Sequence, residues 1–434
     1  MEIISFTSLF LGLITGIHPV EVAVAKPVVA VELRLDGRTV GVMRQAPWNI
    51  PCDFGKTLRP HRIEVVALDA AGTALASSDQ WVNMPRRDAE AEIVLTRDDR
   101  GVPVEARIAW DSLQFKEPRG IEAALDGSPL KANAPGRFRL PLFEEGRLHL
   151  LTAKVEFPRG IVATAEVAVG GVDQQAAAEL TAVPIEMKEG TSIPEPASLE
   201  GALLAGGAPR RVVAIEDGPA DVVIVCDARS GRSLKRLEGR NEYLRLPRDA
   251  GALGDDDEVR LMLTTPRPVQ SRGRTAALFD LSQRFTISDG GVPRLLMTLV
   301  PGMVESGRQS IADAVAIAGI EATRDNRRRA VVLVLGSGKD DRNSYAIPAV
   351  RDYLESLRVP LCVWSVLAPD SKKTVTSWGP AEDASTAEAM DAAVGRLRAA
   401  LSLQRIVWIE GRHLPSDITL VASQPSFRLA GATR

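Results

Sequence analysis

The stretch Asp221-Val-Val-Ile-Val-Cys-Asp227 is an apolar run between two carboxylates, and Val331-Val-Leu-Val-Leu335 is a second apolar run that continues into Gly336-Ser-Gly338. Continuous apolar runs of this length are typical of strands buried on both faces of a parallel sheet. In an open α/β sheet, ligands bind in the crevice at the carboxyl ends of the strands. The two runs therefore predict an α/β domain with a candidate site after each of these strands.

Alternating strand-like and helix-like segments surround these two runs between residues 218 and 410. Strands are predicted at 258–263, 275–279, 361–367 and 405–409, and helices at 310–320, 347–357 and 387–401. Ser385 and Glu388 form a capping-box pattern at the start of the last helix. Apolar strands separated by helices imply a mostly parallel sheet covered on both faces, so this part is expected to be a doubly wound, Rossmann-like α/β domain.

The amino-terminal part contains an internal repeat. Leu35-Asp-Gly37 recurs as Leu125-Asp-Gly127, and the strand-like segment that begins at His61 is matched by one that begins at His149. Asp-Gly between two strand-like runs is a strong hairpin signal, and the following segments alternate apolar and polar residues. Two all-β, Ig-like sandwiches are therefore expected at residues 19–98 and 99–172.

The remaining segments are shorter. Residues 173–217 are expected to be a linker with one β segment, and residues 411–434 a carboxyl-terminal β tail. Residues 1–18 resemble a secretory signal peptide, because the apolar stretch is too short to span a membrane and a small-residue site follows at Ala23-Val-Ala25. The stretch lacks the usual basic residue at its start, where Glu2 stands, and the alternatives are a mis-set start codon or a buried amino-terminal strand.

Composition narrows the function classes. The 434 residues are 45% hydrophobic and 25% charged, as in a folded soluble protein. With 53 basic and 56 acidic residues the net charge is −3, which gives no reason to expect nucleic-acid binding. No stretch approaches the length of a transmembrane helix. The signal-like start leads us to expect a secreted or periplasmic protein.

The three cysteines and four histidines form no catalytic or metal-binding pattern. Cys226 and Cys362 lie in apolar strands, where small buried hydrophobes are expected, and a disulfide between them would require neighbouring strands. The serine in Gly336-Ser-Gly338 lacks the full nucleophile-elbow pattern. We expect no catalytic residues and no enzyme; a hydrolase is the disfavoured alternative.

The α/β part resembles a von Willebrand factor type A (VWA) domain, and the whole chain resembles bacterial VWFA-related proteins, in which β-rich segments precede that domain. The residues that carry the resemblance are Asp221–Ser230, Ser310–Val315, Val331–Gly338 and Arg358–Ser365. The resemblance covers the α/β half of the chain. It implies a doubly wound sheet with a metal-ion-dependent adhesion site at the strand ends.

The residues at the family's metal-binding positions depart from its pattern. The positions correspond here to Asp227, Arg229, Gly231, Gln309 and Ser337, and only Asp227 matches. Arg229 places a positive charge where the family holds Mg²⁺, which opposes cation binding by like-charge repulsion. We therefore expect a degenerate site without a cofactor or metal, and protein–protein interaction that does not depend on a cation.

Three alternatives stay open for this region. Arg229 can replace the cation by pairing with Asp227, which is a hypothesis from their i, i+2 spacing. A shifted Mg²⁺ site near Asp227, built from Ser230, Ser233 or Asp340 and Asp341, would make partner binding cation-dependent. A structural role in an envelope assembly is the third alternative. The sequence does not name the protein partner.

Overall fold

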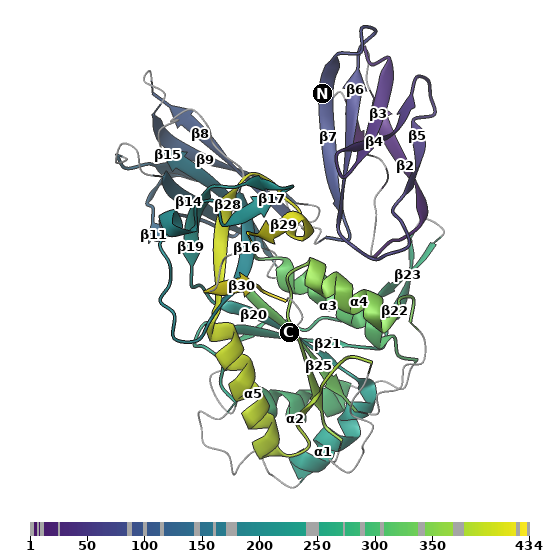
Figure 1. Cartoon of the computed structure of the whole chain (residues 1–434), viewed down its shortest axis with the longest axis vertical. Coiled ribbons are helices and arrows are strands. Elements are labelled where there is room, and N and C mark those ends of the chain that lie inside the picture. Colours follow the sequence, from purple (N-terminus) through teal and green to yellow (C-terminus); the bar gives the residue numbers. More distant parts are fainter. Residues whose placement is uncertain are drawn as a thin grey trace.

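The computed structural model describes residues 4–431 except 7, 9–12, 25–26, 85–88, 99–101, 113–116, 143–147, 159–161, 171–179, 240–250, 272–273, 287–290, 304–307, 337–342, 368–376 and 422–425. The chain forms three β-rich units and one α/β unit (Figure 1). Among the helices within these ranges, none is both long and apolar enough to cross a membrane.

The first β-sandwich consists of two antiparallel sheets. One sheet has the order β1 (Ile4–Phe6), β2 (Ile17–Val24) and β5 (Asn49–Asp53); the other has the order β4 (Arg38–Met43), β3 (Ala30–Leu35), β6 (His61–Leu68) and β7 (Ala74–Val82). Alternate residues of β3 and β6, such as Val31, Leu33, Ile63 and Val65, point into the core, where they are at most 1% exposed. The alternation in the sequence therefore gives the predicted half-buried strands.

The apolar amino-terminal stretch lies within this sandwich. Strand β1 pairs with β2 through Ile4 and Val24, and both Ile4 and Ile14 are buried in the core. This arrangement agrees with the alternative of a buried amino-terminal strand. Strand β2 also crosses the expected boundary at residue 18. Cleavage and export remain predictions.

The second β-sandwich also has two antiparallel sheets. Their orders are β12 (Ala132–Ala134), β13 (Arg137–Arg139), β9 (Pro103–Ser112), β8 (Ala89–Arg97) and β11 (Ser128–Pro129), β10 (Gly120–Leu125), β14 (Leu148–Glu156), β15 (Val162–Gly170). Phe138, Leu151 and Val155 fill the core. Residues 91–96 were expected to end the first sandwich, but β8 pairs with β9 along its whole length and belongs to the second.

The repeat is visible in the local geometry of both sandwiches. The aspartate of each Asp-Gly turn has φ of 49°. Its carboxylate lies 2.8 Å from His61 Nδ1 in the first copy (Asp36) and 2.6 Å from His149 Nδ1 in the second (Asp126). The backbone N–H after each histidine donates to the other carboxylate oxygen, at 2.9 and 2.8 Å. The histidines thus fasten hairpin turns, the structural role expected of them.

A third β unit joins segments that are distant in the sequence. One sheet has the order β19 (Val212–Glu216), β28 (Gln404–Glu410), β16 (Leu180–Met187), β30 (Phe427–Leu429); the other has β18 (Ala208–Pro209), β17 (Leu203–Ala205), β29 (Ile418–Leu420). The 3-10 helices η2 (Pro196–Leu199) and η5 (Pro415–Asp417) flank these sheets. The prediction that residues 405–409 extend the parallel sheet is therefore wrong, because β28 pairs antiparallel with β16 and β19.

The α/β unit is built on a six-stranded sheet. Its order is β24 (Phe285–Thr286), β21 (Glu258–Leu263), β20 (Ala220–Cys226), β25 (Arg328–Leu335), β26 (Leu361–Ser365), β27 (Glu382–Asp383), and only the short β24 is antiparallel. Helices α1 (Gly231–Gly239), α2 (Gly291–Met303) and α5 (Ala387–Ser402) cover one face, and α3 (Ile311–Thr323) and α4 (Ile347–Ser356) cover the other. Successive β20 residues alternate between the two cores: Val222 and Ile224 face the first set of helices, and Val223 and Val225 the second.

Two local predictions for this unit need correction. Residues 275–279 were expected to form a strand of the main sheet, but β22 (Arg267–Ser271) and β23 (Arg274–Leu278) form a separate antiparallel hairpin. The cap of α5 is Thr386, whose hydroxyl accepts a hydrogen bond from Ala389 N at 3.1 Å, rather than the predicted Ser385.

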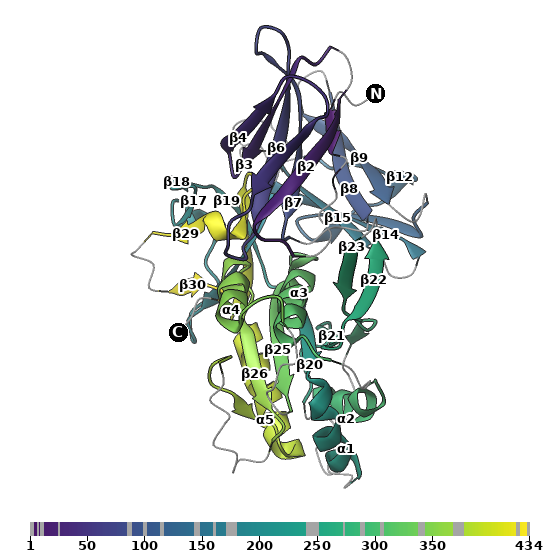
Figure 2. The same ribbon diagram turned by 90° about the vertical axis from the view of Figure 1, so that its right-hand side faces the viewer.

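The first sandwich rests on helices α3 and α4 of the α/β unit (Figure 2). The buried hydroxyl of Tyr353 donates to the Asn83 carbonyl at 2.6 Å, and the Tyr345 hydroxyl donates to the Leu13 carbonyl at 2.9 Å. Leu58 packs into the core beneath α3 and α4. Each sandwich residue here lies in a loop or at a strand end, so the base of the sandwich forms the contact.

Candidate functional site

The candidate site lies at the carboxyl ends of the three central strands. Asp227 follows β20, Thr264 follows β21 and Gly336 follows β25. Helix α1 lies on one face of the sheet and connects β20 towards β21, whereas α4 lies on the other face and connects β25 towards β26. This is the topological switch point of the sheet, the place where open α/β sheets bind ligands.

Asp227 is the central group of this site. It is 0% exposed, and both carboxylate oxygens accept hydrogen bonds from backbone amides. Oδ1 accepts from Arg229 N at 2.8 Å, which caps the short 3-10 helix η3 (Ala228–Ser230), and Oδ2 accepts from Gly336 N at 2.9 Å. Asp227 therefore ties the end of β20 to the end of β25 through the backbone.

Gln309 brings the end of β21 into the same network. Its Oε1 accepts from Ala228 N at 2.8 Å and lies 2.6 Å from the Thr264 hydroxyl. The Thr264 carbonyl also accepts a hydrogen bond from Ser310 N, at 2.9 Å, immediately before α3. Gln309 is 1% exposed, so this residue fixes the start of α3 against the strand ends.

Gly336 holds the two loops in direct backbone contact. A Cβ at this position would lie 2.3 Å from Ser230 N and 2.5 Å from the Arg229 carbonyl carbon. No side chain fits without movement of backbone atoms. Ser230 is fully buried, and its hydroxyl has no hydrogen-bond partner within the described part of the chain.

The residues at the family's metal positions are thus only partly assembled. Gln309 and Asp227 accept hydrogen bonds from two successive backbone amides, those of Ala228 and Arg229, and Gly231 begins α1. Arg229 contacts Asp227 through its backbone N–H; the hypothesised guanidinium–carboxylate pair stays a prediction. Ser337, Asp340 and Asp341 lie outside the described residues.

Two members of the network, Thr264 and Gly336, were not predicted to contribute to it. Thr264 was not singled out, although a polar residue directly after an apolar strand was a usable signal. The close approach at Gly336 had no such signal, because it depends on how two loops meet.

The cysteines behave as buried apolar groups. Burial raises the pKa of the Cys226 thiol to about 12, and the charge of Asp227 acts in the same direction. Burial likewise raises the pKa of Cys362 to about 12. Both thiols are free, and β25 separates their strands, so the predicted small-hydrophobe role fits and the alternative disulfide does not form.

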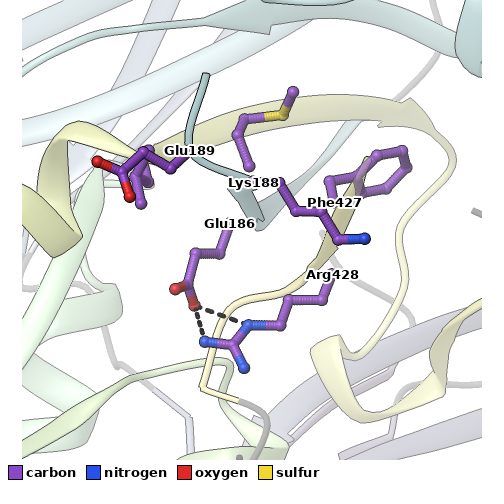
Figure 3. Close-up of a pocket in the computed structure, with 7 residues that line it drawn as sticks. Glu186, Lys188, Glu189, Phe427 and Arg428 are labelled. Carbon is purple, nitrogen blue, oxygen red and sulfur yellow. Dashed lines mark hydrogen bonds and ion pairs between the residues drawn. The ribbon is translucent and has the colours of Figure 1, made fainter. Parts of the chain in front are cut away.

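A separate hollow of about 360 Å³ lies in the third β unit, between β16, β30 and Leu403 after α5 (Figure 3). Two of its charged residues are paired with each other: Arg428 points at Glu186 and donates to one carboxylate oxygen from Nε at 3.0 Å and from Nη2 at 2.6 Å. This ion pair, in which two N–H groups share one carboxylate oxygen, fastens β30 to β16.

Comparisons with known proteins give weak likenesses. No family model and no curated protein matches the chain. Among solved structures, the fibronectin(III)-like modules of Clostridium thermocellum CbhA are 18% identical, with 18% of this chain and 92% of that chain covered and a TM-score of 0.17.

The central fibronectin-III array of RIM-binding protein is 10% identical, with 46% and 81% covered and a TM-score of 0.24. The human COPII-coat protein Sec24c is 14% identical, with 42% and 32% covered and a TM-score of 0.22. Because these TM-scores are low, the likenesses carry no argument, and the description of the two sandwiches rests on the strand pairing within this chain.

Proposed function

We propose that this chain is a secreted or periplasmic protein-binding module in which two Ig-like sandwiches precede a degenerate VWA-like domain that recognises a protein partner without a metal ion. The observation that carries the proposal is the state of Asp227. Both of its oxygens accept backbone N–H groups at 2.8 and 2.9 Å, so the carboxylate serves the scaffold. A Mg²⁺ site prefers near-octahedral oxygen ligands with room for water, and Asp227 is 0% exposed.

Calorimetry with MgCl₂ and MnCl₂ on the full chain tests the metal-free part of this proposal. We expect no binding in the micromolar range. Crosslinking of the tagged protein in its native envelope, with and without EDTA, tests partner recognition. We expect the same specific partner under both conditions; a partner lost in EDTA would overturn metal independence.

Ser230 favours one second candidate, cation-dependent adhesion through a shifted site. Its hydroxyl is buried beside Asp227 and lacks a described partner, and a hydroxyl oxygen is an acceptable Mg²⁺ ligand. Asp227→Ala separates the two candidates. The substitution should abolish EDTA-sensitive partner capture if this second candidate is correct, and should leave metal-independent capture in place otherwise.

A further inference from the structure

A second hollow lies where three units of the molecule meet. It has a volume of about 500 Å³ and opens between the first sandwich, the carboxyl-terminal end of α4 and η5 of the third β unit. Its lining residues are Leu35, Asp36, Arg38, Val40, Arg59, Pro60, Ser356, Leu414, Ser416 and Asp417. We call it the junction pocket. Its size is that of an ordinary pocket for a small ligand or a few side chains.

The junction pocket is lined by two arginines, Arg38 and Arg59, and two aspartates, Asp36 and Asp417. Asp36 is already engaged, because its two oxygens contact His61 Nδ1 and the backbone N–H of the following residue. Arg38 and Arg59 are exposed, and neither guanidinium forms a salt bridge with a described carboxylate, although the charge of Arg59 acts to lower the pKa of both Asp36 and Asp417. Among the described residues, no salt bridge occupies either guanidinium group, so both keep N–H donors for a further carboxylate.

Asp417 lies on the opposite side of the pocket and orients what can enter. Burial raises the pKa of its carboxyl, and the nearby charge of Asp36 adds to the effect. A second carboxylate is therefore disfavoured beside Asp417 and favoured beside Arg38 and Arg59, where guanidinium groups offer bidentate hydrogen bonds.

An apolar wall lies next to these arginines. Strand β4 is an edge strand, and a bulge between its pairings with Leu33 and Arg34 leaves Val40 without an opposite residue. Bulges re-aim side chains, and Val40 lines the pocket with 42% of its surface exposed. Val42, two residues along the same edge, is 48% exposed. A ligand that lies over these valines would cover apolar surface beside the two positive charges.

We propose that the junction pocket binds an acidic peptide segment of the partner protein, with one carboxylate at Arg38 and Arg59 and a neighbouring apolar side chain on Val40 and Leu414. This inference rests on the proposed role in protein recognition and places the recognition away from the strand-end site. Charge complementarity selects the occupant, because a basic or neutral segment would leave both guanidinium groups without a partner.

Fluorescence anisotropy on the full chain tests the proposal with a labelled, end-blocked pentapeptide, Gly-Val-Asp-Leu-Gly, at low ionic strength. The matched probe replaces its Asp by Asn. Each of Arg38→Glu and Arg59→Glu should weaken binding of the acidic probe at least about tenfold, the scale of one lost charge-assisted hydrogen bond. The Asn probe should bind the unaltered protein correspondingly less well.

Arg44→Glu is the matched control. Arg44 is exposed just after β4, forms no ion pair with a described residue and does not line the pocket. This variant should bind the acidic probe like the unaltered protein. Thermal melts accompany all three variants; if Arg59→Glu does not fold, Arg38→Glu decides, because Arg38 lies on the exposed edge strand.

Several outcomes would overturn the inference. These are no binding of the acidic probe, equal binding of the Asn probe, or unchanged binding by Arg38→Glu. Light scattering that shows a dimer broken by Arg38→Glu would also overturn it, because the occupant would then be a second copy. Crosslinking in the native envelope separates the two proposals. Partner capture that persists in Arg38→Glu overturns only the proposal for the junction pocket. The lack of a specific partner for both the unaltered protein and the variant overturns the proposed function.

Discussion

Strand β20 carries two fully buried carboxylates, Asp221 near its amino end and Asp227 just beyond its carboxyl end, and the protein satisfies them by different means. Asp221 accepts from the Arg260 guanidinium, from Nη2 at 2.5 Å and from Nε at 3.3 Å. Asp227 accepts from two backbone N–H groups. One end of the strand therefore depends on a side-chain charge, and the other on the positions of two loops.

The two arrangements differ in what they connect. Arg260 also donates to the Glu321 carbonyl at 2.8 Å and lies 3.2 Å from its carboxylate, so the amino end is bound to the last turn of α3. At the carboxyl end, Asp227 connects η3 to the loop that follows β25 across the crevice. Asp227 therefore joins two loops at the candidate site through backbone N–H groups, whereas the charged network of Asp221, Arg260 and Glu321 lies at the opposite end of the sheet.

The largest effect is expected from Arg260→Ala. Removal of one partner leaves Asp221 buried without its cation, which costs about 3–5 kcal/mol of unfolding free energy. Urea unfolding near neutral pH measures it. The double variant Asp221→Leu, Arg260→Leu removes both charges and should lie closer to the unaltered protein. If the double variant is the less stable one, the amino end does not depend on charge pairing as described.

Asp227→Ala is expected to have the next largest effect. The substitution leaves the amides of Arg229 and Gly336 without their acceptor, at a cost of about 2–3 kcal/mol. Asp227→Asn keeps one oxygen acceptor and should cost less. Chemical unfolding in EDTA and in millimolar MgCl₂ should give the same difference. Stabilisation of only the unaltered protein by MgCl₂ would contradict a carboxylate committed to the backbone.

Gly336→Ala tests whether loop geometry governs the carboxyl end. The added Cβ meets backbone atoms of η3, and overpacking of this kind costs about 1–3 kcal/mol. Gly395→Ala in helix α5 is the matched control, because its added Cβ meets nothing within 4 Å; it should stabilise by up to about 1 kcal/mol through helix propensity. Equal thermal melting shifts for the two variants would refute the close approach.

The smallest effect concerns Asp36, whose carboxylate is bound both by a side chain, His61, and by a backbone N–H, that of Arg62. Burial acts to raise the pKa of Asp36, but hydrogen bonds from His61 and the Arg62 N–H outweigh it, and the pKa lies below its usual value. A lowered folded-state pKa gives stability that is present above about pH 4 and is lost as pH falls through the folded pKa. Asp36→Asn should therefore reduce the loss of unfolding free energy between about pH 4 and lower pH, by less than about 1 kcal/mol in urea unfolding. An unchanged pH dependence would show that Asp36 contributes nothing to it.

The sequence predicts those parts of the fold that local patterns govern. The apolar runs at 221–227 and 331–335 become the central strands, and the Asp-Gly repeat becomes two equivalent hairpins, because buried strands and tight turns have strong local preferences. The strand at 404–410 looks like another buried parallel strand. Its true partners β16 and β19 precede the α/β unit, and no local pattern encodes which sheet a strand joins.

The residues of the candidate site were likewise only partly predictable from the sequence. Asp227 was predictable as a polar residue at the end of a buried strand. Its hydrogen-bond donors were not, because a backbone N–H has no signature in the sequence. The junction pocket is the extreme case: Arg38, Arg59 and Asp417 come from two units far apart in the chain, and only the docking of the first sandwich brings them together.

The pairing of β28 also has a consequence for biosynthesis. Thr181 and Gly411, joined by a hydrogen bond at the end of this sheet, are 230 residues apart, and nearly the whole α/β unit lies between them. The third β unit therefore cannot close on a ribosome until the strand after α5 has emerged. The two amino-terminal sandwiches use strands that are close in sequence and can fold during synthesis. Strands β16 and β19, by contrast, stay without their partner β28 while the α/β unit is made. Chaperone protection would matter most at that stage.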